Sequence, residues 1–176
     1  MRRILTALTW AAAAAALTLL FATVLLPRLT GWVPLTVLSG SMEPSIPAGS
    51  MIAVEPLHGE EGLRQIDVGD VVTFMPWPDD PTLVTHRVHS LGATVDGETV
   101  LTTQGDANDS VDPEPVGAPQ LRGKVRYHVP YAGSLSTVLN TDQKRTGLTV
   151  VAAGLFGYAG WQVLSAARAR RAAKRE

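Results

Sequence analysis

Residues 37–44 read VLSGSMEP, and the rest of the chain is organised around this stretch. A short apolar run ends at a Ser-Gly-Ser sequence, and Met-Glu-Pro follows it. Gly40 permits a tight backbone conformation beside a hydroxyl, while Pro44 stiffens the chain that comes next. The stretch is typical of an ordinary turn after a strand, because Ser and Gly favour turns. It also fits a rigidly held serine, Ser41, whose hydroxyl projects from a strand edge as a nucleophile requires.

Charge is distributed unevenly along the 176 residues, although the net charge is only −1. Residues 1–28 carry three basic side chains and no acid, and residues 144–176 carry seven basic side chains and one acid. Residues 43–142 carry fifteen acids and five basic side chains. Basic ends around an acidic centre are typical of a membrane protein, and no basic patch with interleaved aromatics predicts nucleic-acid binding. The chain has no cysteine, which excludes disulfides, thiolate metal ligands and a cysteine nucleophile.

Two uncharged stretches are long enough to cross a lipid bilayer as helices. Residues 4–26 follow Arg2 and Arg3, which favour a cytoplasmic N-terminus, and Pro27 is expected to end this helix. A cleaved signal peptide is the competing interpretation, but its apolar core is usually shorter. Residues 146–164 precede a basic cluster that favours a cytoplasmic C-terminus. We predict a cell-membrane protein with an N-terminal anchor (1–28), an extracytoplasmic domain (29–145) and a second transmembrane helix with a basic cytoplasmic tail (146–176).

The segment between the two apolar stretches is predicted to be mainly β-structure. Asp96 and Gly97 form a two-residue hairpin signal between two strand-like runs. Short strands at this spacing, without helical periodicity of useful length, favour a compact antiparallel β catalytic domain flanked by the two transmembrane helices. The predicted strands cover residues 51–54, 70–75, 83–91, 99–103 and 121–129.

A serine nucleophile requires a base, and all four histidines lie in the predicted external domain. Strand alternation places Val84, His86 and Val88 on one face. The valines predict that this face is buried, so His86 is expected in a partly dry setting and His89 in water. His86 is therefore the candidate base, although a histidine on an apolar face is commonly a core residue. A metal pair of His86 and His89 is disfavoured, because alternation directs the two side chains to opposite faces.

Three carboxylates, Asp106, Asp109 and Asp112, lie within seven residues after a predicted strand. One of them could accept the second imidazole proton of His86 and so fix its tautomer. An Asx-rich loop that caps its own backbone is the structural alternative. A calcium loop is disfavoured because its required glycine and terminal glutamate are replaced, and no metal or other cofactor is expected. Residues 108–110 also match a glycosylation acceptor, a pattern that is frequent by chance.

Four motifs resemble, in their order, those of type I signal peptidases of the endoplasmic-reticulum and archaeal class. This class includes the signalase catalytic subunit and has histidine where the common bacterial enzymes have lysine. The resemblance covers roughly residues 37–133 and is specific only in combination. The motifs are residues 39–44 (SGSMEP), 84–88 (VTHRV), 105–112 (GDANDSVD) and 123–133 (GKVRYHVPYAG).

The resemblance implies a membrane-bound serine endopeptidase that removes signal peptides from exported preproteins. By position, Ser41 matches the nucleophile, His86 the general base and Asp112 the third catalytic residue. Asp106 matches an aspartate of the same motif whose role is less clear, and Asp109 is an additional candidate carboxylate.

The same resemblance extends to the oxyanion hole and to the expected partners of the chain. Ser39 matches a hydroxyl that helps form the oxyanion hole in the lysine-type relatives, and the Ser41 N–H is the other expected donor. The expected partners are preproteins and the lipid bilayer. Two other functions fit the residues: a dedicated or self-processing membrane serine protease, and a non-catalytic membrane scaffold of the same fold.

Overall fold

A computed structural model describes residues 2–77 and 81–134, and seven positions further along the chain: 149, 153, 154, 157, 158, 161 and 162. Apart from those seven positions, the predicted second transmembrane helix and its basic tail lie outside the described residues. The chain forms two compact units, Ala16–Leu135 and a second that combines Met1–Ala15 with Ser136–Glu176. Within the second unit, the rings of Trp10 and Tyr158 lie 6.4 Å apart.

The chain begins with a long apolar helix, as its sequence predicts, but the prediction that Pro27 ends this helix is wrong. The helix comprises α1 (Arg2–Leu20), a π-helical turn η1 (Phe21–Leu25) and α2 (Leu26–Thr30). Pro27 is tolerated because it lies in the first turn of α2, and the helix ends at Gly31, which has a φ of 76°. Thr6–Thr30 contains an 18-residue stretch with a mean hydropathy of 2.0 and is the one helix in the described part of the chain that is long and apolar enough to cross a membrane.

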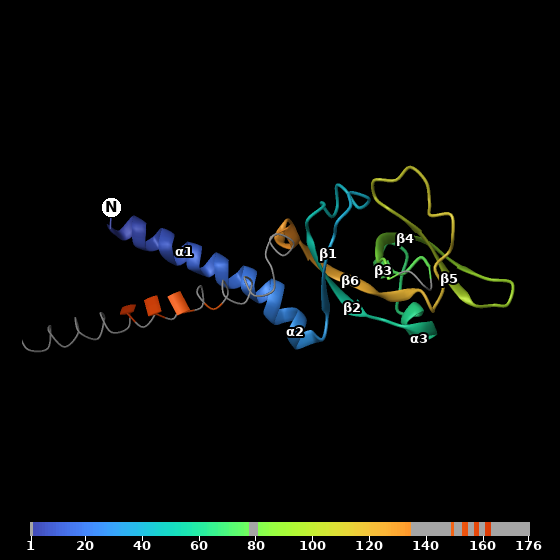
Figure 1. The fold of residues 1–176 in the computed structure, drawn as a ribbon, viewed down its shortest axis with the longest axis horizontal. Helices are drawn as coiled ribbons and strands as arrows, with labels where there is room; N and C mark the ends of the chain where they lie inside the picture. The colour runs from blue at the N-terminus through green and yellow to red at the C-terminus, as the bar shows by residue number, and fades with distance from the viewer. Residues whose placement is uncertain are drawn as a thin grey trace, which may run out of the picture. The chain divides into compact units, whose positions relative to one another are not determined.

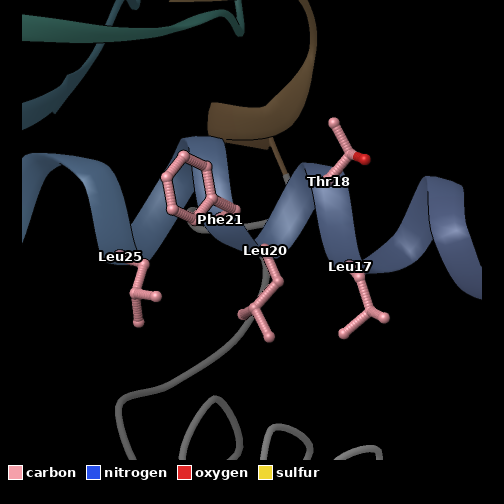
Figure 2. Close-up of a pocket in the computed structure, with 5 residues that line it drawn as sticks. All are labelled: Leu17, Thr18, Leu20, Phe21 and Leu25. Carbon is pink, nitrogen blue, oxygen red and sulfur yellow. The ribbon is translucent and has the colours of Figure 1, made fainter.

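The surface of this helix has a hollow of about 430 Å³ where α1 meets the π-helical turn. Leu17, Leu20 and Leu25 project to one side of the helix there (Figure 2). Phe21 and Thr18 complete the lining, which is mostly apolar. The helix therefore has an exposed apolar surface here that the β domain does not cover.

The β domain is a six-stranded antiparallel sheet (Figure 1). Its strand order is β1-β2-β6-β3-β4-β5, so the last strand of the chain lies in the middle of the sheet. The mainly antiparallel β architecture predicted from the sequence is therefore confirmed. The strands are β1 (Val33–Thr36), β2 (Met51–Pro56), β3 (Val71–Phe74), β4 (Val84–Ala93), β5 (Thr99–Gln104) and β6 (Leu121–Val129).

Two short elements were not predicted from the sequence. The strand β1 contains Pro34, which removes a backbone donor and so weakens the strand signal. It lies at the edge of the sheet, where a proline is tolerated. The helix α3 (Gly59–Leu63) has only five residues, too few for a helical periodicity to be visible.

Two hydrophobic clusters hold the domain together. The larger cluster contains residues from β3, β4, β5 and β6, among them Phe74, Val88 and Leu121. The smaller cluster includes Met42 and Ile46, which come from the turn after β1, and Ile52 from β2. Met42 is completely buried, so the turn that carries Ser41 is anchored in the core by its next residue.

Candidate active site

Ser41 lies in the turn that connects β1 to β2, which confirms the turn that the sequence favoured and not the strand-edge placement. Its Oγ lies 3.3 Å from the Oγ of Ser39, so the two hydroxyls of the motif point at each other. The buried Met42 fixes this turn from below, and the Ser41 carbonyl oxygen accepts a hydrogen bond of 2.9 Å from the N–H of Ala107. The serine is therefore held by its own neighbours and by the loop that follows β5.

Gly105, which directly follows β5, gives this loop its close approach to the serine. A Cβ atom on Gly105 would lie 2.6 Å from the Ser41 carbonyl oxygen and 3.1 Å from Nε2 of His86. Any side chain at this position would therefore collide with both residues. Ser41 and His86 border the same small space, which the absence of a side chain at Gly105 leaves open.

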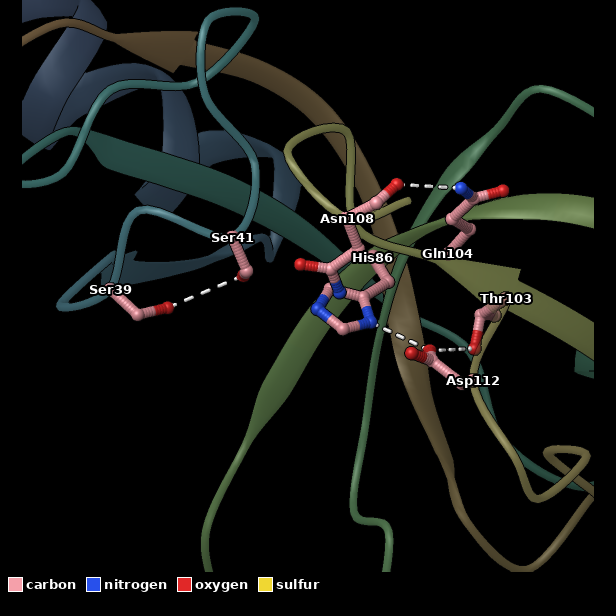
Figure 3. Close-up of polar contacts among 7 residues, drawn as sticks. All are labelled: Ser39, Ser41, His86, Thr103, Gln104, Asn108 and Asp112. Carbon is pink, nitrogen blue, oxygen red and sulfur yellow. Dashed lines mark hydrogen bonds and ion pairs between the residues drawn. The ribbon is translucent and has the colours of Figure 1, made fainter. Parts of the chain in front are cut away.

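His86 lies on β4 and its side chain is buried on the inward face, as strand alternation predicts. Its Nδ1 lies 2.6 Å from Oδ2 of Asp112. The same carboxylate oxygen accepts a 2.6 Å hydrogen bond from the buried hydroxyl of Thr103 on β5. Because the carboxylate accepts, Nδ1 carries the proton and Nε2 is left as an acceptor. Figure 3 shows this second nitrogen on the side of the ring that faces Ser41.

The imidazole lines a largely apolar cavity. The cavity has a volume of about 210 Å³, and Trp77, Val84 and Val116 contribute to its walls. The Phe74 ring approaches the imidazole edge-on, with ring centroids 6.3 Å apart. Apolar surroundings on this side strengthen the hydrogen bond between the imidazole and the carboxylate.

Asp106 lies outside this pair and binds Arg87. Two hydrogen bonds of 2.8 and 2.7 Å join the Arg87 guanidinium to the two carboxylate oxygens of Asp106. Arg87 also donates to the Gly69 carbonyl oxygen, over 2.9 Å. The Arg87 hydrogen bond lowers the pKa of Asp106, and a further hydrogen bond from Ser45 adds to this effect. Asp106 therefore connects β4, beside His86, to the turn that carries Ser41.

Two hydrogen-bond donors near Ser41 could stabilise the negative charge that develops on a substrate carbonyl oxygen. Within the described part of the chain, the Ser41 N–H donates to no acceptor, so it remains available to a carbonyl oxygen. The Ser39 hydroxyl is the second candidate donor, since it contacts Ser41 Oγ. An N–H and a hydroxyl beside a serine nucleophile form the kind of donor pair that stabilises an oxyanion.

The remaining candidates from the sequence lie apart from this centre. Asp109 is exposed in the loop after β5, and His89 is exposed on the other face of β4. Asp106 and Asp112 bind different partners, Arg87 and His86, which argues against a shared calcium site. Among the described residues, no group of three or more histidine and acidic side chains could hold a metal ion.

Four contributors to the site were given no role from the sequence: Thr103 and Ser45, and the motif residues Gly105 and Arg87. A signal existed for Thr103, because alternation from the buried Leu101 places its side chain on the inward face of β5. No local pattern pairs Arg87 with Asp106, which are 19 residues apart, or Ser45 with the same carboxylate.

Comparison with known proteins agrees with this geometry. Residues 8–146 match the family model of signal peptidase, peptidase S26. The chain is 38% identical over 99 residues to signal peptidase I W of Bacillus subtilis, a match that covers 56% of this chain and 48% of that protein. The chain thus spans about half the length of that relative.

A second relative comes from a fungus. The chain is 30% identical over 128 residues to the signal peptidase complex catalytic subunit of Verticillium alfalfae, across 69% of this chain and 70% of that protein. The matched family region contains the serine turn, His86 and Asp112; His86 binds Asp112, and Gly105 lies against both the serine turn and His86. The chain therefore belongs to the peptidase S26 family of signal peptidases.

Proposed function

We propose that this chain is a membrane-anchored serine endopeptidase that removes signal peptides from exported preproteins. The observation that carries the proposal is the imidazole of His86, bound at Nδ1 by Asp112 and presenting Nε2 on the side of Ser41. This is the arrangement that a serine hydrolase needs, in which a carboxylate orients the base and the base faces the hydroxyl. The family membership supplies the substrate class.

The reaction begins when Ser41 Oγ attacks the carbonyl carbon of the scissile peptide bond. The hydroxyl proton passes to Nε2 of His86, and Asp112 stabilises the imidazolium that forms. The Ser41 N–H and the Ser39 hydroxyl stabilise the negative charge on the carbonyl oxygen. The C–N bond then breaks, the leaving amine takes the proton from His86, and an ester joins the signal peptide to Ser41.

A water molecule completes the cycle. His86 accepts a proton from the water as the oxygen attacks the ester carbonyl carbon. The C–O bond to Ser41 breaks, and Ser41 recovers its proton from His86. The products are a signal peptide with a free carboxyl end and a mature protein with a free amino end, so no cofactor is required.

Asp106 acts in this proposal as a positioning residue and not as a proton carrier. Its ion pair with Arg87 lowers its pKa, so the carboxylate remains charged throughout the physiological range. It connects the strand that carries the base to the turn that carries the nucleophile, through Arg87 and Ser45. Its role is to hold these two elements at a fixed separation.

The helix Thr6–Thr30 supports a membrane location for the enzyme. We infer that it anchors the chain with its N-terminus in the cytoplasm, and that residues 146–164 form a second span returning the C-terminus there. Ser41 follows the helix end by eleven residues, so it lies close to the outer membrane surface. A signal peptide has its apolar core in the bilayer and its cleavage site just beyond, where Ser41 can reach it.

The decisive experiment incubates the full-length protein in liposomes with several unrelated preproteins and maps the new N-termini by mass spectrometry. Cleavage at the end of each signal peptide, lost in both Ser41→Ala and His86→Ala, is the expected result. Asp109→Asn, in an exposed loop, provides the matched control and retains activity. Cleavage of a single partner or of the chain itself indicates a dedicated or self-processing protease. If the native protein cleaves none of the preproteins, the chain is a scaffold.

A further inference from the structure

The helix that precedes the sheet contains a backbone acceptor that its own helix cannot satisfy. In the π-helical turn, the Leu26 N–H donates to the Phe21 carbonyl oxygen, five residues earlier. The next bond in this register would run from residue 27 to the Ala22 carbonyl oxygen. Position 27 is a proline and has no N–H. The Ala22 carbonyl oxygen therefore requires a donor from outside the helix.

Tyr127 supplies that donor from the middle of the sheet. Its hydroxyl donates to the Ala22 carbonyl oxygen over 2.5 Å, between residues 105 positions apart. The Trp32 ring, just after the helix, packs against the Tyr127 ring with centroids 5.9 Å apart. Burial raises the pKa of Tyr127, which keeps its hydroxyl protonated as a donor. Pro27 itself is fully buried, so its packing fixes the end of the helix together with the contacts of Tyr127.

The same part of the sheet carries the nucleophile. Tyr127 lies on β6 and pairs with Ala53 of β2. The strand β2 begins at Met51, directly after the loop that holds Ser41, and its other neighbour is β1. One rigid unit of three strands therefore joins the end of the helix to the serine turn. A change in the helix direction relative to β6 would shift Ser41 relative to the membrane.

We propose that Tyr127 is a positioning residue that determines which peptide bond of a membrane-inserted substrate reaches Ser41. The proposal rests on the proposed signal peptidase function. A substrate held in the bilayer by its apolar segment offers successive peptide bonds at increasing distance from the lipid. The height of Ser41 above the lipid then selects among them, and the hydrogen bond from Tyr127 to Ala22 keeps that height constant.

A distance measurement tests the physical part of this proposal without reference to activity. The chain has no cysteine, so Leu17→Cys and Val95→Cys introduce two unique spin-label sites, both on exposed residues of the Ala16–Leu135 unit. Double electron–electron resonance between the two spin labels, with the protein in liposomes, then gives the distribution of helix-to-sheet distances. Tyr127→Phe removes one hydrogen bond and should raise the population of displaced orientations about threefold to tenfold. Tyr131→Phe, at an exposed tyrosine, should leave the distribution unchanged.

Replacement of the proline identifies the mechanism. Pro27→Ala restores an N–H to the helix, so the helix can satisfy its own carbonyl. Tyr127→Phe should therefore broaden the distribution much less in a Pro27→Ala background than alone. Equal broadening in both backgrounds, or none in either, overturns the assignment of the Tyr127 hydroxyl to this carbonyl.

The functional part requires a preprotein with several consecutive alanines at the cleavage region. Mass spectrometry of the mature N-termini should show one dominant site for the native enzyme and for Tyr131→Phe. Tyr127→Phe should spread cleavage to neighbouring bonds while total cleavage stays within about threefold. In a Pro27→Ala background, Tyr127→Phe should change the site profile much less, because the Ala22 carbonyl no longer depends on the tyrosine. An unchanged site profile in Tyr127→Phe overturns the positioning role. Absence of cleavage by the native enzyme instead refutes the proposed function, and the distance measurement still decides on the hydrogen bond.

Discussion

Gly105 lies so close to Ser41 that a Cβ atom at this position would approach the Ser41 carbonyl oxygen to 2.6 Å. Backbone atoms are on both sides of this contact, so neither partner can move away as a flexible side chain could. The glycine has no unusual φ and is required for space alone. The separation between the nucleophile and the base therefore depends on position 105 having no side chain.

Gly105→Ala should reduce kcat at least about a hundredfold, because a displacement near 1 Å at the nucleophile has an effect of that size. The measurement is the steady-state rate on a preprotein or a signal-peptide substrate. Gly92→Ala is the matched control, since a Cβ there meets its nearest neighbour, Val100, at an ordinary 3.7 Å. Full activity in Gly105→Ala would show that the loop relaxes without moving Ser41.

Asp112→Asn should lower kcat by about a thousandfold to ten-thousandfold while leaving the fold intact. The amide keeps the shape of the carboxylate but loses its charge, and it favours the wrong imidazole tautomer. Thr103 continues to pack in place, so the melting temperature should change little. Asp109→Asn should retain native kcat. If Asp109→Asn lost activity and Asp112→Asn did not, the carboxylate that orients His86 would be Asp109.

Ser39→Ala should reduce kcat by about tenfold to a thousandfold and leave KM nearly unchanged, because an oxyanion donor acts mainly in the transition state. Ser39 is exposed, so its replacement has little effect on stability. Ser39→Thr, which keeps the hydroxyl, should recover part of the rate. An equal loss in both variants would mean that the space around Ser39 matters and the hydroxyl does not.

Asp106→Asn should lower the free energy of unfolding by about 1–2 kcal/mol at neutral pH, since the bidentate bond to Arg87 becomes an uncharged one. The folded pKa of Asp106 lies below its ordinary value of about 3.9. The stabilising contribution is therefore complete above pH 5 and is lost as the pH falls through the lowered folded pKa.

Thermal unfolding of the native and Asp106→Asn proteins between pH 3 and pH 8 measures this contribution directly. The difference between the two should be constant from pH 5 upwards and should shrink below about pH 4. Asp96→Asn, in the exposed β4–β5 hairpin, should show no such pH-dependent difference. A difference that grew on acidification would contradict the sign of the Asp106 pKa shift.

Local sequence patterns predicted most of the sheet because each strand contains its own signal. Residues 121–129 were predicted with the bounds that β6 has, and the alternation around His86 correctly placed it on the buried face. The edge strand with Pro34 and the five-residue helix α3 carry too little periodic information to be recognised.

The contacts between distant segments could not be predicted in this way. Alternation places Arg87 on the face of β4 opposite His86, where most charged residues are solvated, and its partner Asp106 lies across a sheet register that only the fold defines. The hydrogen bond from Tyr127 to Ala22 depends on a π-helical turn, which leaves no recognised pattern in the sequence. The sequence resemblance indicated which residues belong to the site, but the partner of each carboxylate became visible only with the three-dimensional structure.

The position of β6 in the sheet has a consequence for biosynthesis. Strands β1 and β2 follow the N-terminal apolar helix and flank the serine turn, whereas β3, β4 and β5 carry the histidine and lead into the loop with its aspartate. These two halves share no strand pairing except through β6, which is translated last. In a ribosome-bound chain that lacks residues 121–129, only the loop after β5, through Ala107 and Asp106, contacts the serine turn from the half that carries the base. We expect the site to become stably assembled only once β6 has been added to the sheet.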